Sequence, residues 1–567
     1  MNLRRIIRIC FLSLTEWRER WRSLLLCLVS GAILFLAQPR PGWWPLVFFG
    51  LAPFLLAVRS ERLPVARFWL GWIFGMTYFY GAFFWLNTLI HYNLFIVIGI
   101  MLLAAVSALA PGALALIAGT WNARRPGLDL FFLIAQAALW CVVDWIRGFG
   151  TFAFPWGYLA YPLYRHPTFI QLGAWTGVYG ITFVLFICNG AVARLLLWYF
   201  ETIRGRQPSR NRAPARDGAS SFPWLSVGVA LLLCAANLIL GATILKRAMT
   251  EPAHPQVTVG VIQPNVPQDY KLASYIHPDP EVRARLQNEM FDLNLQMLFE
   301  LWNRSPDVEV FIFPESAVTD PNFFADATGK AALTQAAKRV GAALLFGADY
   351  ETPPQPATSA DDRPTTHHYN SAWFVDDQTG ISPSVYSKRH LVPFGEHVPY
   401  FDKIPYFQDV IVQVGSFSKG AGPVVFEHKD IRLGPLICFE SALAYLTREN
   451  VRAGSNLLAV ITNDAWYFES SGLEQHFLQS VFRAVESRRS VVRAANTGVS
   501  GVISPYGIVQ RRQELGTRNA FAAKVELRSE LTFYTRFGDV FVLMAAGGAL
   551  LAFVIHLKAG GTRREEK

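Results

Sequence analysis

The feature that most constrains this chain is a series of long apolar segments that flank one more polar stretch on both sides. Phe68–Ile90 contains no charged residue and is long enough to cross a hydrocarbon core of about 30 Å. Comparable apolar segments follow at Leu94–Trp121, Leu128–Val143, Thr168–Val192, Trp224–Leu245 and Val540–Leu557. Ser23–Ala37 and Trp43–Val58 lie near the lower limit of length. The sequence therefore predicts a multi-pass α-helical membrane domain with eight spans.

The distribution of Lys and Arg predicts how these spans are oriented, because cytoplasmic loops retain positive charge. Basic residues gather at the N-terminus, in the loops after the second, fourth and sixth spans, and in the C-terminal tail. With eight spans all of these positions fall on one side. Both termini are therefore expected on the cytoplasmic side, with the large polar stretch outside. The N-terminal basic region is long and no small-x-small site follows it, which predicts an uncleaved first span.

Composition supports a membrane protein and argues against a nucleic-acid partner. Only 17% of the residues are charged, whereas soluble domains have about 25%. The net charge of +10 is explained by the basic cytoplasmic loops, and a nucleic-acid surface needs basic residues clustered on one folded face. The predicted organisation is a membrane domain with seven helices over residues 1–246, an outer domain over 247–537, and a last helix with a cytoplasmic tail over 538–567.

The outer stretch alternates strand and helix patterns. Gln256–Gln263 is rich in β-branched residues and predicts a strand, and an amphipathic helix is expected over Pro280–Trp302. Leu473–Ala494 is predicted to be one long helix. Further strands are predicted at Val308–Phe313, Ala342–Phe346, Tyr369–Val375, Ser384–Lys388, Pro423–Glu427, Ile431–Cys438, Leu457–Thr462, Val499–Ser504, Val509–Arg512 and Ala520–Val525. Apolar strands mixed with helices indicate an α/β domain whose sheets are covered by helices.

Two segments of this stretch are expected to be irregular. Thr352–Arg363 is polar and Pro-rich, which is typical of an exposed loop. Tyr400–Phe417 carries several large apolar side chains with weak periodicity. This segment is interpreted either as a packed loop or as an apolar arm that contacts the bilayer or a lipid substrate.

Reactive side chains follow three of the predicted strands. Cys438 is the one cysteine outside the hydrophobic segments and ends an apolar strand, Glu315 follows a buried strand, and Lys388 closes another. A thiol near its ordinary pKa of about 8.5 is mostly protonated at neutral pH, so attack on a carbonyl needs a base and a positive charge. Sites in α/β sheets collect at the carboxyl ends of strands, where these three residues can converge.

The motifs around these residues resemble those of the nitrilase superfamily, whose Glu-Lys-Cys triad follows this chain order. The matching phrases are "FPES", "YSKRHLVPFGE" and "LICFES". With the surrounding spans, and with "TNDAWY", "RAVESRRSVVRAANTGVSGVI" and "FYTRFGD", the chain is similar to the apolipoprotein N-acyltransferase family of that superfamily. The resemblance implies an extracytoplasmic nitrilase-like αββα sandwich over residues 247–537, on the periplasmic side of a bacterial inner membrane.

The resemblance also implies a role for each matching residue. Glu315 would accept the proton of the thiol, Lys388 would stabilise the oxyanion, and Cys438 would be the nucleophile. Glu396 resembles the second glutamate of the family, which supports the lysine, although a structural ion pair is the plainer alternative. Glu440 follows the nucleophile closely and would be a further supporting carboxylate.

Three aromatic residues are expected to contact substrate. Phe439 stands where the family often has tyrosine, so a hydroxyl contact is missing here. Trp156, in "FPWGY", resembles a tryptophan at the mouth of the active site, with an interfacial anchor as the alternative. Trp466, in "NDAWY", would lie near the entrance or pack in the core.

The activity implied by the resemblance is transfer of a fatty acyl group from a membrane phospholipid to the N-terminal amine of the S-diacylglyceryl cysteine of an apolipoprotein, through a thioester on Cys438. No cofactor or metal is expected, since the sequence has no Walker-type loop and no His/Cys ligand cluster. Two alternatives are kept open: a membrane-anchored amidase or nitrilase that uses water, and a transporter or receptor. Transporters usually place ionisable residues within spans, whereas Asp144 and Arg147 are nearly the only ones here.

Overall fold

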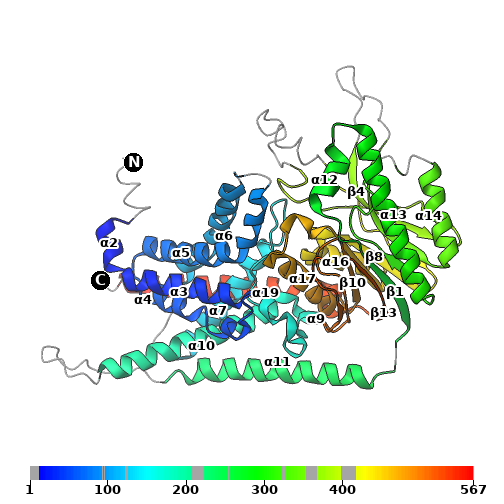
Figure 1. Cartoon of the computed structure of the whole chain (residues 1–567). Helices are drawn as coiled ribbons and strands as arrows, with labels where there is room; N and C mark the ends of the chain where they lie inside the picture. Colours follow the sequence, from blue (N-terminus) through cyan, green and yellow to red (C-terminus); the bar gives the residue numbers. More distant parts are fainter. Residues whose placement is uncertain are drawn as a thin grey trace, which may run out of the picture. The chain divides into compact units, whose positions relative to one another are not determined.

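The computed structural model describes residues 12–91, 94, 96–119, 121, 126–205, 222–252, 254–320, 323, 327–352, 367–397 and 417–565 (Figure 1). Residues 353–363 of the predicted exposed loop and residues 400–416 of the predicted apolar segment lie outside this part of the chain. The chain divides into two compact units. The first comprises Met1–Arg147, Pro155–Ala248 and Asp539–Lys567, and the second comprises Gly148–Phe154 and Met249–Gly538.

The first unit is helical. Its helices are α2 (Leu14–Glu19), α3 (Trp21–Ala37), η1 (Trp44–Phe48), α4 (Ala52–Ser60), α5 (Pro64–Phe83), η2 (Phe84–His91), α6 (Ile96–Ala118), α7 (Pro126–Ile146), η3 (Tyr161–Arg165), α8 (Pro167–Ile170), α9 (Gly173–Thr176), α10 (Val178–Gly205), α11 (Trp224–Thr250) and α19 (Val540–Glu565). Helices α5 and α6 approach closely because α5 carries glycine at the contact. A Cβ added at Gly71 would lie 2.4 Å from the carbonyl oxygen of Pro111, so only glycine fits there. Small residues at helix contacts are typical of membrane bundles.

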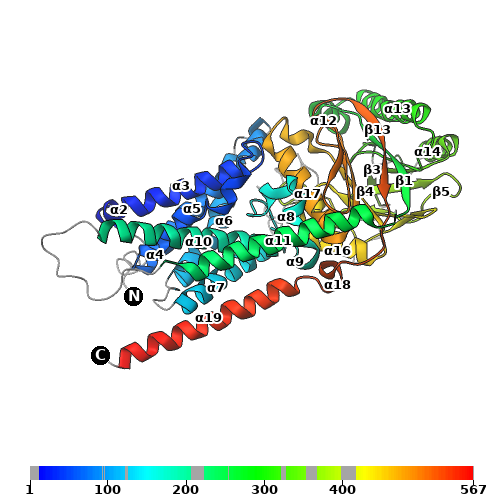
Figure 2. The ribbon, with the colours of Figure 1, turned by 90° about the horizontal axis from the view of Figure 1, so that it is seen from below.

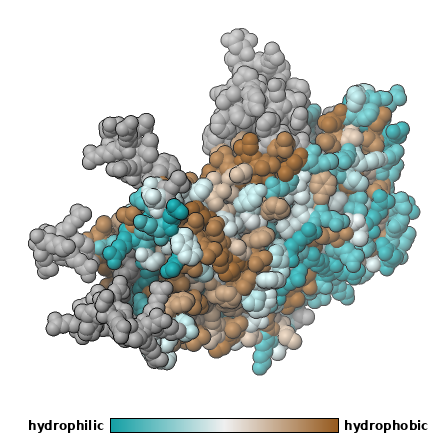
Figure 3. All heavy atoms as spheres, turned by 60° about the vertical axis from the view of Figure 1, so that its left-hand side comes forward, coloured by the Kyte–Doolittle hydropathy of each residue, from teal (hydrophilic) through white to brown (hydrophobic). Residues whose placement is uncertain are grey.

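Six helical segments in the described part of the chain are long and apolar enough to cross a membrane: Pro64–His91, Ile96–Ile117, Pro126–Ile146, Val178–Thr202, Trp224–Thr250 and Val540–Lys558. Two shorter apolar helices span Trp21–Ala37 and Trp44–Ser60. Large apolar side chains such as Leu231, Ile239 and Met544 are exposed, and Figure 3 shows broad hydrophobic areas over the helices. Several helices of this unit thus have the length and the apolar surface that a bilayer requires.

The predicted span over Thr168–Val192 is wrong in its position. The chain forms the short helices α8 and α9 there, and Gly177 at φ +63° separates α9 from α10. The long helix begins at Val178 and its apolar part extends to Thr202. The uncharged sequence before Gly177 is apolar enough for a span, but a glycine in a left-handed conformation ends one helix before the next begins.

The second unit contains two β-sheets. The first has the order β13–β1–β2–β3–β4–β5, with β6 also paired to β4, and the second has the order β12–β11–β10–β9–β8–β7. The strands are β1 (Gln256–Gln263), β2 (Val310–Ile312), β3 (Ala343–Glu351), β4 (His368–Asp376), β5 (Gly380–Ile381), β6 (Tyr386–Ser387), β7 (Phe426–His428), β8 (Ile431–Ile437), β9 (Leu457–Thr462), β10 (Ser490–Ala495), β11 (Gly501–Ile503), β12 (Val509–Arg512) and β13 (Asn519–Glu526). The central strands β1–β3 and β8–β10 are parallel, so their carboxyl ends share one edge in each sheet.

Helices cover the outer faces of the two sheets. Figure 2 shows α13 (Pro280–Arg304) and α14 (Ala327–Val340) on one side of the strands, and α16 (Ala444–Arg452) and α17 (Ser471–Ser487) on the other. Alternate residues of a strand point to opposite faces. Val261 and Ile461 accordingly lie in the apolar core between the sheets, whereas Phe311 packs with Leu301 of α13. The layers are helix, sheet, sheet and helix, as the αββα expectation requires.

The predicted long helix over Leu473–Ala494 is too long. Helix α17 ends at Ser487, because Arg488 adopts a left-handed conformation at φ +52°. Ser490–Ala495 then forms β10 between β9 and β11. The β-branched pair Val491 and Val492 favours a strand, but the arginine-rich helical pattern before it concealed the boundary. The short helices α12 (Gln268–Ile276) and α16 were also not predicted.

Candidate active site

Glu315 lies just beyond the end of β2 and its carboxylate is held from both sides. Oε1 accepts a hydrogen bond of 2.7 Å from Asn370 Nδ2, and Oε2 accepts one of 2.7 Å from the backbone N–H of Asn463. Asn370 belongs to the first sheet and Asn463 follows β9 of the second, so the carboxylate connects the two sheets. The chain can reach this position because β3 has Gly347, where a Cβ would lie 2.6 Å from Glu315 Cα.

Lys388 is a buried cation between two carboxylates. Its Nζ lies 2.6 Å from Glu396 Oε1 and 3.5 Å from Glu315 Oε1. Burial opposes the charge, but Glu396 and Glu315 hold the pKa of Lys388 well above its usual range. Glu396 is fixed in turn, since its Oε2 accepts the backbone N–H of Val392 at 2.9 Å. The two carboxylates therefore favour the charged ammonium and fix its position.

Cys438 follows β8 at a sharp strand-to-helix turn. Its φ of +52° is in the left-handed region, which costs a non-glycine residue about 1–3 kcal/mol and persists only where the surroundings enforce it. Burial and the nearby charge of Glu315 raise the pKa of the Cys438 thiol, and Lys388 acts in the opposite direction. The resting group is consequently a neutral thiol that needs a base before it can attack.

Glu440 joins the cysteine turn to the lysine segment. Oε2 accepts hydrogen bonds from the backbone N–H of Ile437 at 2.9 Å and from the Tyr386 hydroxyl at 2.7 Å. Oε1 accepts the backbone N–H groups of Arg389 at 2.6 Å and His390 at 3.2 Å. Burial raises the pKa of Glu440, although these donors oppose the shift. The carboxylate has four donors and is fully buried, so it fixes the chain on either side of the site.

The predicted aromatic contacts occupy different surroundings. Phe439 is buried and lies parallel to Phe154 and His390, with ring centroids 6.1 and 5.6 Å apart. Burial lowers the pKa of His390 to about 4, so this ring is neutral at pH 7. Trp466 is half-buried in the short helix η5 (Asp464–Tyr467), directly after β9. Trp156 belongs to the first unit, where it is buried beside Trp85.

The polar pair of the first unit is an ion pair. Arg147 Nη1 lies 3.1 Å from Asp144 Oδ1, and Arg147 Nη2 donates to the carbonyl oxygen of Trp156 at 2.5 Å. Asp144 is buried, and a buried charge near a span needs such a partner. The pair anchors the chain beside Trp156.

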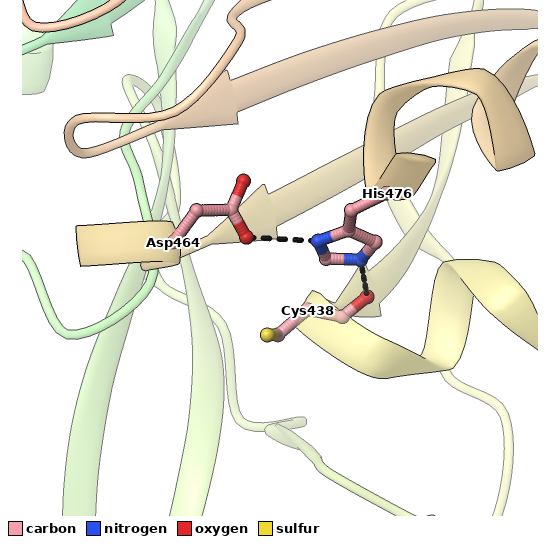
Figure 4. A group of neighbouring side chains, drawn as sticks. All are labelled: Cys438, Asp464 and His476. Carbon is pink, nitrogen blue, oxygen red and sulfur yellow. Dashed lines mark hydrogen bonds and ion pairs between the residues drawn. The ribbon is translucent and has the colours of Figure 1, made fainter. Parts of the chain in front are cut away.

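Sequence reasoning missed several residues that hold the site. Asn370 lies inside a strand and carries no motif signal. Asp464 and His476 lie next to Cys438 (Figure 4). Arg493 of β10 forms an ion pair with Asp464. A signal for Asp464 is available in "TNDAW", which places a carboxylate at the end of an apolar strand. The sequence predicts that His476 lies in a helix, but it does not show which residues the side chain contacts.

Two family models match separate parts of the chain. The apolipoprotein N-acyltransferase N-terminal domain matches residues 30–191, and the carbon-nitrogen hydrolase domain matches residues 276–529. An apolipoprotein N-acyltransferase from Geobacter metallireducens is 31% identical over 93% of this chain and 94% of its own length. An apolipoprotein N-acyltransferase from Azotobacter vinelandii is 30% identical over 92% of this chain and 92% of its own length. A solved carbon-nitrogen hydrolase from Helicobacter pylori is 14% identical, covers 51% of this chain and 95% of its own, and has a TM-score of 0.35.

Both matched domains occur in the expected order, and the matches to the relatives extend over nearly the full length of each chain. The nitrilase-like α/β unit is thus combined with apolar helices in one protein, as the sequence motifs indicated. The hydrolase alternative is not favoured, because these relatives are acyltransferases along both parts of the chain. The chain therefore belongs to the apolipoprotein N-acyltransferase family, acyltransferases of the carbon-nitrogen hydrolase superfamily that acylate lipoproteins at a membrane.

Proposed function

We propose that the acyl donor is a membrane phospholipid and that the acyl group passes through a thioester on Cys438. The observation that carries this proposal is the buried arrangement of Lys388 between Glu315 and Glu396, next to a thiol on a strained turn. Such an arrangement supplies a base, a fixed cation and a nucleophile. Family membership supplies the lipoprotein acceptor.

In the first half-reaction Glu315 accepts the proton of the Cys438 thiol while Sγ attacks the ester carbonyl carbon. The carbonyl oxygen becomes an oxyanion, and Lys388 Nζ stabilises the developing charge. The intermediate collapses when the C–O bond to the glycerol breaks, and protonated Glu315 returns its proton to the departing oxygen. The products are a lysophospholipid and an acyl thioester on Cys438.

In the second half-reaction the free α-amine of the lipid-modified cysteine of the apolipoprotein attacks the thioester carbonyl. Glu315 accepts the proton that the nitrogen loses, and Lys388 again stabilises the oxyanion. The C–S bond breaks, the Cys438 thiolate recovers a proton from Glu315, and the product is an amide. Glu396 and Glu440 act as supporting residues that hold the lysine and the cysteine turn.

The substrate contacts and the membrane arrangement belong to the same proposal. Phe439, Trp156 and Trp466 contact the acyl chains or the acceptor. The chain crosses the bacterial inner membrane eight times, with seven helices in residues 1–246 and one in 538–567. The catalytic domain, residues 247–537, is periplasmic and both termini are cytoplasmic. Six long apolar helices and two shorter ones support eight crossings, since the shorter ones have lengths near the lower limit.

Mass spectrometry of the purified protein after incubation with phospholipid tests the donor and the nucleophile together. We expect an acyl adduct on Cys438 and release of one lysophospholipid. Cys438→Ala should form no adduct, whereas Cys234→Ala, which removes a thiol of the first unit, should form it normally. Glu315→Gln should not accumulate the adduct, because an amide cannot accept the thiol proton. A folded Cys438→Ala protein that still transfers acyl groups would refute the mechanism.

The orientation is tested separately with reporter tags. A tag after Lys567 should report the cytoplasm, and a tag within residues 353–366 should report the periplasm. A cytoplasmic signal from the second position would overturn the proposed topology without affecting the chemistry.

A further inference from the structure

A buried group of side chains lies beside the turn that carries Cys438. Asp464 follows β9, His476 lies on α17 and Arg493 lies in β10, and all three are almost fully buried. Figure 4 shows the ring of His476 between Asp464 and the carbonyl group of Cys438. The proposed mechanism assigns no role to this group.

The hydrogen bonds fix which atom of His476 carries a hydrogen. His476 Nε2 lies 3.0 Å from the carbonyl oxygen of Cys438, and a carbonyl oxygen only accepts. Nε2 must therefore be the donor. Nδ1 then accepts a hydrogen bond from Arg493 Nη2 at 2.9 Å. Asp464 lies 2.8 Å from Nδ1 and accepts from the same guanidinium, so Asp464 and Arg493 together hold the ring in this orientation.

Asp464 is itself held rigidly. Its Oδ1 also accepts the Thr462 hydroxyl at 2.9 Å, and its Oδ2 accepts Arg493 Nη2 at 2.8 Å. The packing is tight, since a Cβ at Gly498 would lie 2.3 Å from Oδ2. A chain of fixed contacts thus runs from Asp464 through His476 to the backbone of the nucleophile.

A metal site is a poor description of this group. The donor atoms of Cys438, Asp464 and His476 lie within 4.8 Å of one another, which is a spacing that a cation could use. However, Arg493 Nη2 lies 2.8 Å from Asp464 Oδ2 and 2.9 Å from His476 Nδ1, so a permanent positive charge already occupies the space between these ligands. The role of the group is better explained by the hydrogen bond from His476 to the carbonyl oxygen of Cys438.

The carbonyl of Cys438 and the N–H of Phe439 belong to one peptide unit. A donor at the carbonyl oxygen polarises that unit and makes its N–H a stronger donor, since connected hydrogen bonds strengthen one another. In hydrolases whose nucleophile lies at a strand-to-helix turn, the N–H that follows the nucleophile contributes to the oxyanion hole. The left-handed Cys438 also needs contacts that enforce its conformation.

We propose that His476, held by Asp464, is a positioning residue that orients and polarises the Cys438–Phe439 peptide, so that the Phe439 N–H stabilises the oxyanion of acyl transfer. Ser441 assists, because its hydroxyl donates to the same carbonyl oxygen at 3.0 Å. The inference rests on the proposed thioester chemistry. It predicts that His476 matters for reactions that form an oxyanion and not for the reactivity of the thiol itself.

Two reactions of Cys438 separate these effects. Acylation by phospholipid passes through an oxyanion. Alkylation by iodoacetamide consumes the thiolate and forms no oxyanion. His476→Gln places an amide near the position of Nε2 and keeps a donor for the Cys438 carbonyl. His476→Asn is shorter and keeps only the side of the ring that faces Asp464. Gln479→Leu is the matched control, since it removes a buried polar side chain of the same helix that makes no bond to Cys438.

We expect His476→Asn to slow acylation by about tenfold. This effect is smaller than the about 10²–10³-fold loss that follows removal of a direct oxyanion donor. Its alkylation rate should stay within about twofold of the wild type, since no oxyanion forms there. His476→Gln should recover most of the acylation rate, and Gln479→Leu should retain both reactions. Equal losses in both reactions, or undiminished acylation by His476→Asn, would overturn the inference. If the wild type itself forms no adduct, the thioester proposal fails instead.

Discussion

Replacement of Glu440 by glutamine tests whether one buried carboxylate joins the two halves of the site. The amide is nearly the same size, so the change concerns hydrogen bonding alone. Its oxygen can still accept the N–H groups of Arg389 and His390. Its NH2 group must then face the N–H of Ile437, although the Tyr386 hydroxyl can reverse and accept.

The expected loss follows from these contacts. One buried N–H without an acceptor costs about 1–3 kcal/mol, and loss of the charge weakens the remaining bonds by roughly 1 kcal/mol in total. The free energy of unfolding of the second unit should thus fall by about 2–4 kcal/mol. For a unit of this size the melting temperature should fall by roughly 5–10 °C.

The same change should affect catalysis, because Glu440 fixes the segment after Lys388 relative to Cys438. A displacement near 1 Å costs about 10²-fold in rate, so acyl-thioester formation should fall by a comparable factor. The assay combines thermal unfolding with mass spectrometry of the adduct, and Glu427→Gln, an exposed glutamate of β7, is the control. A Glu440→Gln protein with wild-type melting and wild-type thioester formation would refute the reasoning.

Three further changes test other parts of the site. Lys388→Arg should reduce acyl transfer about 10²–10³-fold although the charge is kept, since a planar fork does not fit between two carboxylates placed for an ammonium; near-normal kcat would contradict this. Gly347→Ala should lower thioester formation about 10²-fold, because the added Cβ would lie 2.6 Å from Glu315 Cα and displace the base; unchanged kinetics would show that the loop adapts. Lys271 donates to the carbonyl oxygen of Glu315 at 3.0 Å, and burial lowers the pKa of Lys271 to about 8 despite the charges of Glu315 and Asp349. Unfolding between pH 8 and about 10 should therefore take up a proton, so wild-type stability should rise with pH relative to Lys271→Met by at most about 1.4 kcal/mol per pH unit; parallel stability profiles would refute the assignment.

Much of the fold could be predicted because its signals are local. The strands Gln256–Gln263 and Leu457–Thr462 form with the predicted bounds, since runs rich in apolar or β-branched residues need no distant partner to be recognised. Two of the errors occurred where the decision depends on one backbone conformation. Arg488 and Gly177 have positive φ, and each ends a helix that the surrounding pattern would continue.

Some candidate residues of the site could be named from the sequence, but their arrangement could not. Chain order and motifs drew attention to Glu315, Lys388 and Cys438, and Glu396 and Glu440 were expected to support them. No sequence pattern showed that Asn370 and the backbone of Asn463 hold the Glu315 carboxylate from different sheets. Those contacts join residues that are far apart in the chain, and they exist only after the two sheets have packed.

The sequence by itself determined the apolar helices, the α/β stretch between them and the chemical types of the reactive side chains, because hydropathy and periodicity are properties of neighbouring residues. Tertiary structure alone decided that Glu440 joins the cysteine turn to the lysine segment and that His476 faces the carbonyl of Cys438. The physical reason is that a buried polar group must find its partners wherever the packed core places them. Those partners are set by the distances between strands in space, and not by their separation along the chain.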